Sequence, residues 1–127
     1  MDTSALLALM DAGDEGHARA LKAWDGLATE GPQLVTSNYV YVETFALLQS
    51  RIGLDAARAL QQDVLPALRV AWIDAEIHAA AVAAVLAMGR RGLSLVDCSS
   101  FEIMRRRGIA RAFHFDRHFR QQGFESV

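Results

Sequence analysis

Cysteine and proline are scarce, with one Cys and two Pro among 127 residues, and long apolar runs are missing. A single cysteine excludes an internal disulfide and fits a reducing compartment. No stretch approaches the roughly 20 consecutive apolar residues needed to cross a bilayer, and the first residues lack the basic region of a signal peptide. We therefore expect a cytoplasmic protein that does not act at a membrane.

Several catalytic motifs are also missing from the sequence. It has no Walker A loop and no Gly-x-Gly-x-x-Gly, so it does not support nucleotide binding by those loops. Cys98 lacks a paired His/Asn motif, and we interpret it as a small buried side chain rather than a nucleophilic thiol. Ser99 and Ser100 lack a plausible His–Asp pairing, and we expect them to support Asp97 through hydrogen bonds.

Neither sign of charge dominates, because 13 Lys and Arg residues oppose 15 Asp and Glu residues for a net charge of −2. This balance does not by itself indicate a nucleic-acid-binding protein. The arginines are unevenly placed, however, and the last third of the chain holds Arg90, Arg91, Arg105, Arg106, Arg107, Arg111, Arg117 and Arg120. A phosphate-binding surface and an ordinary solvated face both fit this group.

Chain length and an apolar content of 52% predict one globular domain over residues 1–127. Short β-like runs at 34–36, 69–73 and 112–115 alternate with segments of helical periodicity. The first helix is predicted from residue 17 to a stop at Gly31-Pro32, and the second over 38–51. A third should run from an N-cap at Asp55 to Pro66. Further helices are predicted over 74–89, over 94–107 and from Asp116 onward. This rhythm predicts an α/β fold with helices on both faces of a small, mostly parallel sheet.

Two acids lie on helical faces that are otherwise apolar. Asp97 shares its face with Phe101 and Met104, and Glu43 shares another with Tyr39. A bare buried carboxylate is costly and becomes tolerable when it meets a cation. Each acid also has a purely structural explanation, a capping box for Asp97 and an exposed edge position or an arginine partner for Glu43. The recurrence of the feature on two helices weakens that explanation.

Two further acids stand where strands are expected to end. Asp116 follows the run at 112–115, and Asp2 would follow a first strand that is missing from this sequence. Ligand sites in open α/β sheets form outside the carboxyl ends of the strands. Four carboxylates gathered there would attract a hard divalent cation, Mg²⁺ or Mn²⁺ rather than Zn²⁺. Such a metal activates water and stabilises a phosphodiester displacement, with arginines holding the phosphates.

Zinc is a weaker alternative at His114, Asp116 and His118. Strand geometry should project His114 and Asp116 to one side, whereas His118 should begin a helix, and no cysteine lies nearby.

The ordered set of acidic motifs resembles the PIN-domain ribonucleases, in particular the VapC-type toxins of bacterial toxin–antitoxin pairs. The matching segments are 2–4 (Asp-Thr-Ser), 36–44, 93–101 and 115–119 with Gly123-Phe124. The resemblance implies a three-layer α/β/α domain in which Asp2, Glu43, Asp97 and Asp116 bind Mg²⁺ or Mn²⁺, supported by Ser4 and Ser99. It further implies a homodimer that cleaves RNA, and inhibition by a cognate antitoxin in the active-site groove. From their charge and their place in the last third of the chain, we expect Arg105, Arg106, Arg107 and Arg117 to hold the RNA phosphates.

One departure from the family concerns the first strand. The family carries several apolar residues before the first Asp, whereas only Met1 precedes Asp2 here. We therefore expect the natural chain to carry a short apolar segment before Met1. The alternative function is that of a catalytically inactive relative that binds RNA or a protein through the same groove; the presence of all four acids favours the enzyme.

Overall fold

The computed structural model describes residues 1–31, 33–89 and 92–127. Pro32 and two of the arginines noted above, Arg90 and Arg91, lie outside the described residues. The helices are α1 (Thr3–Met10), α2 (His17–Glu30), α3 (Asn38–Arg51), α4 (Leu54–Ala59), α5 (Ala75–Met88), α6 (Leu95–Arg107) and α7 (Arg117–Gln121), with a π-helical turn η1 (Leu60–Val64) and a 3-10 turn η2 (Leu65–Ala67) after α4. None of the helices in these ranges is long and apolar enough to cross a membrane.

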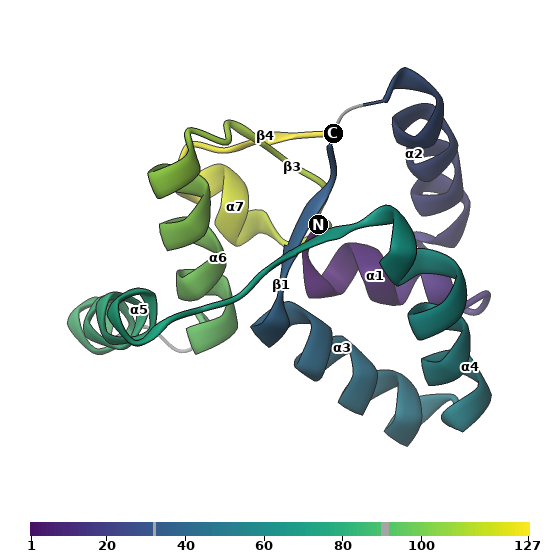
Figure 1. Ribbon diagram of the computed structural model, residues 1–127, viewed down its shortest axis with the longest axis horizontal. Helices are drawn as coiled ribbons and strands as arrows, with labels where there is room; N and C mark the ends of the chain where they lie inside the picture. The colour runs from purple at the N-terminus through teal and green to yellow at the C-terminus, as the bar shows by residue number, and fades with distance from the viewer. Residues whose placement is uncertain (32, 90–91) are drawn as a thin grey trace.

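Four short strands form two parallel ribbons. They are β1 (Val35–Ser37), β2 (Arg69–Ala71), β3 (Arg111–Ala112) and β4 (Glu125–Ser126), paired as β1 with β2 and β3 with β4. Figure 1 shows α1 and α2 on one side of β1, and α6 and α7 on the other. The predicted α/β class, with helices flanking a small parallel sheet, is therefore confirmed.

Local capping chemistry sets most helix boundaries where the sequence predicted them. The Ser37 side chain accepts from the Val40 N–H and opens α3, and Asp74 accepts from the Ile77 N–H and opens α5. At the other end, α5 and α6 both stop at a glycine in the left-handed conformation, Gly89 with φ 55° and Gly108 with φ 64°.

Two local predictions are wrong. Asp55 does not cap α4, because Gly53 takes that place with φ 131°, and Asp55 instead pairs with Arg58 at 2.9 Å. The strand predicted over 112–115 ends at Ala112. The Phe115 N–H is taken by the Ser4 hydroxyl at 2.9 Å rather than by a neighbouring strand, so this segment is fixed to the start of α1.

Two apolar clusters hold the helices in place. The larger one joins α1, α3 and η1 through fully buried Leu6, Leu48 and Leu60. The smaller one fixes α7 against α6, since the Phe101 ring lies 4.9 Å from that of Phe119 in an edge-to-face arrangement. The second cluster matters for function, because it sets the position of Asp116 relative to Asp97.

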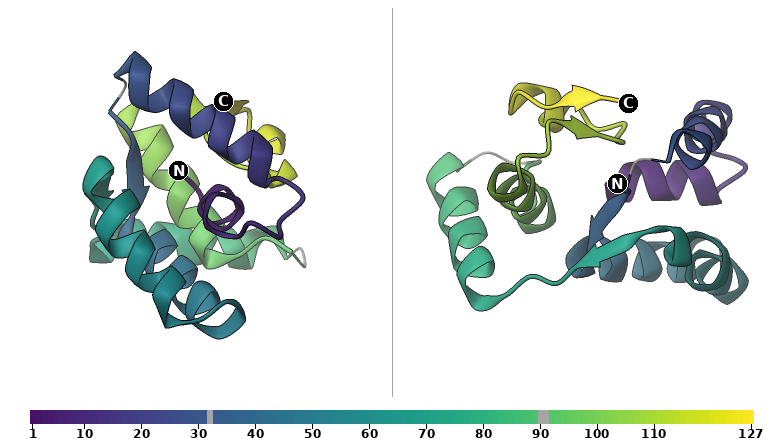
Figure 2. Two further views of the ribbon diagram at one scale, coloured as in Figure 1. Left: turned by 90° about the vertical axis from the view of Figure 1, so that its right-hand side faces the viewer. Right: turned by 45° about the horizontal axis from the view of Figure 1, so that its top comes forward.

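The first two residues lie between the two ribbons. The Asp2 N–H donates to the Phe113 carbonyl at 3.1 Å, and the Thr36 hydroxyl donates to the Met1 carbonyl at 3.2 Å. The Met1 amino group is buried and donates to the Val35 carbonyl. The right-hand view of Figure 2 shows the N-terminus in this intermediate position. A cavity of about 720 Å³ continues between β1 and β3 beside Met1.

Candidate metal centre

Three acids lie at the N-termini of three helices. Asp2 is the N-cap of α1, and its Oδ2 accepts from the Ser4 amide and hydroxyl at 3.1 and 2.7 Å. Asp116 is the N-cap of α7, and its Oδ1 accepts from the His118 N–H at 2.9 Å. Free N–H groups and the helix dipole make such positions favourable for carboxylates.

Asp97 lies in the first turn of α6, as the N3 residue of a capping box whose N-cap is Ser94. Its Oδ2 accepts from both the amide and the hydroxyl of Ser94 at 2.8 Å, while the Ser94 hydroxyl accepts from the Asp97 N–H at 3.0 Å. The predicted capping box is confirmed, and it fixes the orientation of the carboxylate.

Each of these carboxylates keeps one oxygen without a hydrogen bond within the described residues. The free atoms are Oδ1 of Asp2, Oδ1 of Asp97 and Oδ2 of Asp116. Glu43 follows the same pattern, because only its Oε2 accepts, from the Thr3 hydroxyl at 2.6 Å. One oxygen is thus held rigidly by the protein, and the other is available to a ligand.

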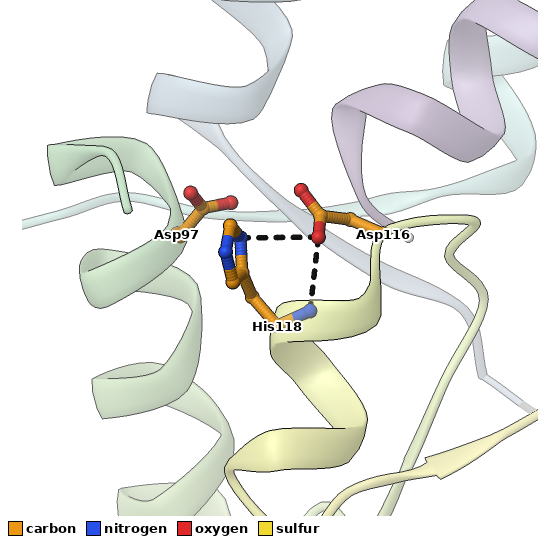
Figure 3. A group of neighbouring side chains, drawn as sticks. All are labelled: Asp97, Asp116 and His118. Carbon is orange, nitrogen blue, oxygen red and sulfur yellow. Dashed lines mark hydrogen bonds and ion pairs between the residues drawn. The ribbon is translucent and has the colours of Figure 1, made fainter. Parts of the chain in front are cut away.

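Asp97, Asp116 and His118 form the tight part of the site. Their ligand atoms all lie within 4.8 Å of one another, and Figure 3 shows the His118 ring between the two carboxylates. His118 Nδ1 lies 3.0 Å from Asp116 Oδ1. His118 begins α7 as predicted, and as the second residue of that helix it lies beside the N-cap, Asp116. His114 lies apart, buried, with its Nε2 3.0 Å from the Ser126 hydroxyl.

Burial gives Asp97 unusual electrostatics, since its side chain is only 9% exposed. Desolvation raises the pKa of the Asp97 carboxyl above its ordinary value, and the negative charges of Asp2 and Asp116 raise it further. Hydrogen bonds from Ser94 oppose this shift without cancelling it. A cation among the three acids would remove the repulsion between them.

Asp2 and Glu43 lie outside the tight group of three but are connected to it. After burial, the negative charge of Asp2 is one of the causes that raise the pKa of Asp97. Glu43 is tied to Thr3, the neighbour of Asp2, across 40 positions of sequence. Thr3 carries no signal of this role in the sequence, because only tertiary structure places it against α3.

Of the two predicted supporting serines, one contacts its acid. The Ser4 hydroxyl donates to Asp2 and accepts from the Phe115 N–H, so it ties α1 to the segment that carries Asp116. Ser99 does not hydrogen-bond to Asp97. Its buried hydroxyl donates to the Val96 carbonyl at 2.8 Å, one turn back in α6. The hydrogen bonds that we expected Ser99 to donate to Asp97 are donated by Ser94 instead.

The predicted phosphate-binding arginines divide into two sets. Arg105, Arg106 and Arg107 end α6, whereas Asp97 stands in its first turn, so about 12–15 Å of helix separates them. Arg106 also pairs with Glu76 at 2.9 Å and with Glu102 at 2.6 Å. Arg117, in contrast, is exposed and directly follows Asp116.

The donor set fits a hard divalent cation. Carboxylate oxygens of fixed orientation suit Mg²⁺ and Mn²⁺, and the imidazole of His118 would be better tolerated by Mn²⁺. A structural zinc site would require several Cys or His ligands, and the group holds only one such residue. The carboxylates of Asp97 and Asp116, with His118 beside them, form a donor set that can hold a divalent metal at the N-termini of α6 and α7.

Comparison with known proteins defines the family. The PIN domain family model matches residues 1–125. The chain therefore belongs to the PIN-domain family. It is 38% identical over 128 residues to the 23S rRNA-specific endonuclease VapC20 of Mycobacterium tuberculosis, covering all of this chain and 95% of that protein. The ribonuclease VapC26 of the same organism is 39% identical over 64 residues, 50% of this chain and 45% of VapC26.

A solved structure agrees with this assignment. The crystal structure of the Mycobacterium tuberculosis VapC20, described as a sarcin–ricin loop cleaving toxin, superposes with a TM-score of 0.88 at 36% identity. The match covers 99% of this chain and 95% of that one. The resemblance to the VapC-type PIN ribonucleases and the three-layer α/β/α fold are thereby confirmed.

Proposed function

We propose that this protein is a metal-dependent endoribonuclease that hydrolyses RNA phosphodiester bonds, the toxin of a type II toxin–antitoxin pair. The observation that carries the proposal is the set of four carboxylates, each with one oxygen fixed and one free, within a PIN domain. The full-length similarity to a protein named as an rRNA endonuclease supports RNA as the substrate.

The four acids have defined roles in this proposal. Asp97 and Asp116 would hold Mg²⁺ or Mn²⁺ directly, and Asp2 and Glu43 would complete the ligand set. The metal supplies an activated water and offsets the charge that develops on the phosphate.

The chain itself contributes orientation and substrate binding. Ser94 fixes Asp97 through two hydrogen bonds of 2.8 Å, and Ser4 fixes Asp2. Arg117, next to Asp116, is placed to bind the phosphate being cleaved. The arginines of 105–107 would bind phosphates farther along the RNA, as their distance from Asp97 requires.

The remaining components follow from the same family relation. The antitoxin would block the groove that holds the acids, and the toxin would act as a homodimer in the cytoplasm. Large apolar side chains available for such contacts include Trp72, which is 76% exposed, Leu86 at 75% and Val42 at 63%. Contacts with a second copy or with the antitoxin would remove these side chains from water.

The test measures metal binding and cleavage separately. Isothermal titration with Mn²⁺ should show binding that Asp97→Asn weakens, and a structured RNA should be cleaved with Mn²⁺ but not with EDTA. A parent protein that binds RNA and Mn²⁺ yet leaves the RNA intact would favour the inactive binding module instead.

A further inference from the structure

A second cavity, of about 380 Å³, opens beside Asp116. Asp116 is the member of the candidate metal centre that lines it, so the cavity adjoins the centre at this residue. Three arginines contribute to the rest of the lining, Arg19 from α2 together with Arg117 and Arg120 from α7. Its volume falls within the range of about 300–1,000 Å³ that small-ligand sites occupy.

The three arginines outnumber the acidic side chain that lines the cavity, Asp116, and give the cavity a net positive charge. Across the described ranges, none of the three arginines takes part in an ion pair. Arg120 Nε donates to the Ser126 hydroxyl at 3.0 Å, which leaves its other N–H groups available. The arginines make this cavity attractive to an anion.

An aromatic ring forms the other recognisable feature of the cavity. Phe115 is 37% exposed, and the Arg19 Cζ lies 5.0 Å from its ring centre. The Phe115 N–H donates to the Ser4 hydroxyl, which anchors this segment to the start of α1 beside Asp2. Bases of unpaired RNA stack on aromatic rings and on arginine guanidinium planes.

We propose that this cavity is a nucleotide subsite that receives an unpaired nucleotide adjacent to the scissile phosphate. Its base stacks on the Arg19–Phe115 pair, and its phosphate lies between Arg117 and Arg120. The inference rests on the proposed ribonuclease function and adds a structural requirement to it. Because a paired base cannot leave its neighbours without an unstacking cost, the subsite favours loops and single strands over duplex RNA.

The test measures equilibrium binding of a short fluorescent single-stranded RNA in EDTA, where no cleavage interferes. Phe115→Leu should weaken binding roughly 5- to 150-fold, the cost of losing one stacked base, and leave the salt dependence unchanged. Phe115→Tyr should restore the affinity. The double variant Arg117→Ala/Arg120→Ala should flatten the plot of log K against log salt by about 0.7 for each phosphate that the variant no longer binds.

Two further variants keep the result interpretable. Arg58→Ala removes an exposed arginine of α4 and should match the parent in both affinity and slope. Arg19→Gln alters the stacking pair through an exposed side chain without touching the core, and it should weaken binding even if Phe115→Leu folds poorly. Titration with Mn²⁺ checks that each variant keeps its metal centre.

The outcomes separate this inference from the proposed function. Parental affinity and slope in the Phe115, Arg19 and double arginine variants would overturn the subsite, whether or not the parent cleaves RNA. Loss of binding in these variants, from a parent that shows no metal-dependent cleavage, would support the subsite and contradict the nuclease function.

Discussion

Three features of Asp97 act on its ionisation. Burial and its acidic neighbours, Asp2 and Asp116, disfavour the charged form, whereas the hydrogen bonds of its capping box favour it. Because its pKa is raised in the folded state, folding favours the protonated carboxyl. The stability that this contributes is fully present below about pH 4 and is lost as pH rises through the raised pKa. The ionised carboxylate therefore costs stability at neutral pH unless a cation binds.

Asp97→Asn should remove that pH dependence. Without metal, the variant should be as stable as the parent or more stable at pH 7, because it loses the repulsion but keeps the side-chain size and the ability to accept from Ser94. With metal it should show no RNA cleavage. Thermal melts in EDTA from pH 4 to pH 8 check the first point, and a variant that melts far below the parent would show that the carboxylate serves the fold.

Ser94 and Ser99 allow a matched comparison of two serines in the same region. Ser94→Ala should destabilise the protein by about 1 kcal/mol through loss of the N-cap, and it should weaken Mn²⁺ binding because Asp97 loses its orientation. Ser99→Ala removes only a bond to the Val96 carbonyl, so metal affinity should stay near the parental value. Titration of both variants with Mn²⁺ measures the two affinities. An equal loss of affinity in both variants would contradict the role given to Ser94.

At the level of single residues, the sequence predicted the capping box of Asp97 and the helix that begins at Asp116, because capping is local chemistry. The Ser-x-x-Asp pattern at 94–97 and the lone acid at Asp116 can be recognised within one helical turn. Thr3 and His118 could not be assigned in the same way. Their partners depend on packing between α1 and α3 and on the turn that brings His118 beside its own cap.

At the scale of elements, helices were predicted more accurately than strands. Their ends carry explicit signals such as Asp74 and Gly108, whereas the strand expected over 112–115 is cut short by a single hydrogen bond from Phe115 to Ser4. The sequence could not predict that bond, because Ser4 lies 111 positions away from Phe115. Because the strands are short, Asp2, Asp97 and Asp116 lie at helix N-termini rather than within long strands.

Helix α6 carries a prediction about its arginine end. Replacing Arg105, Arg106 and Arg107 by Ala should weaken RNA binding and flatten its salt dependence by an amount equivalent to one or two phosphates, since three consecutive helical residues span about 200° of arc. Arg106→Ala alone should have little effect, because Glu76 and Glu102 hold its guanidinium. Binding isotherms at low and high salt measure this, and parental affinity in the triple variant would return these residues to an ordinary solvated face.

At the scale of the whole molecule, a cavity separates the two ribbons. Its lining includes residues of β1 and β3 together with Met1. The buried amino group there has its pKa lowered from 8.0 to about 6, chiefly by desolvation. Between these values the folded amine is neutral while the unfolded one is protonated, so stability should rise with pH from about 6 to 8.

Adding a short apolar segment before Met1 should fill this space with a strand parallel to β1 and β3. Each large side chain so buried contributes roughly 1.5–3 kcal/mol, and the pH dependence between 6 and 8 should disappear because a peptide bond replaces the amine. Thermal melts of both lengths across that range provide the measurement. A polar Gly/Ser segment of equal length is the control. Equal melting temperatures for the given chain, the apolar extension and the Gly/Ser extension would mean that the sheet needs no further strand.

The bond between Ser4 and Phe115 has a consequence for folding kinetics. Asp97 and Asp116 come together through a modest loop, but Asp2 reaches them only when the two ends of the chain meet across 111 positions. Contacts of such sequence separation are slow to form, because chain entropy is lost before they contribute any stability. The full set of carboxylates is therefore assembled only in molecules that have completed folding, and if these acids bind the metal as proposed, a newly made or partly unfolded chain would lack that affinity.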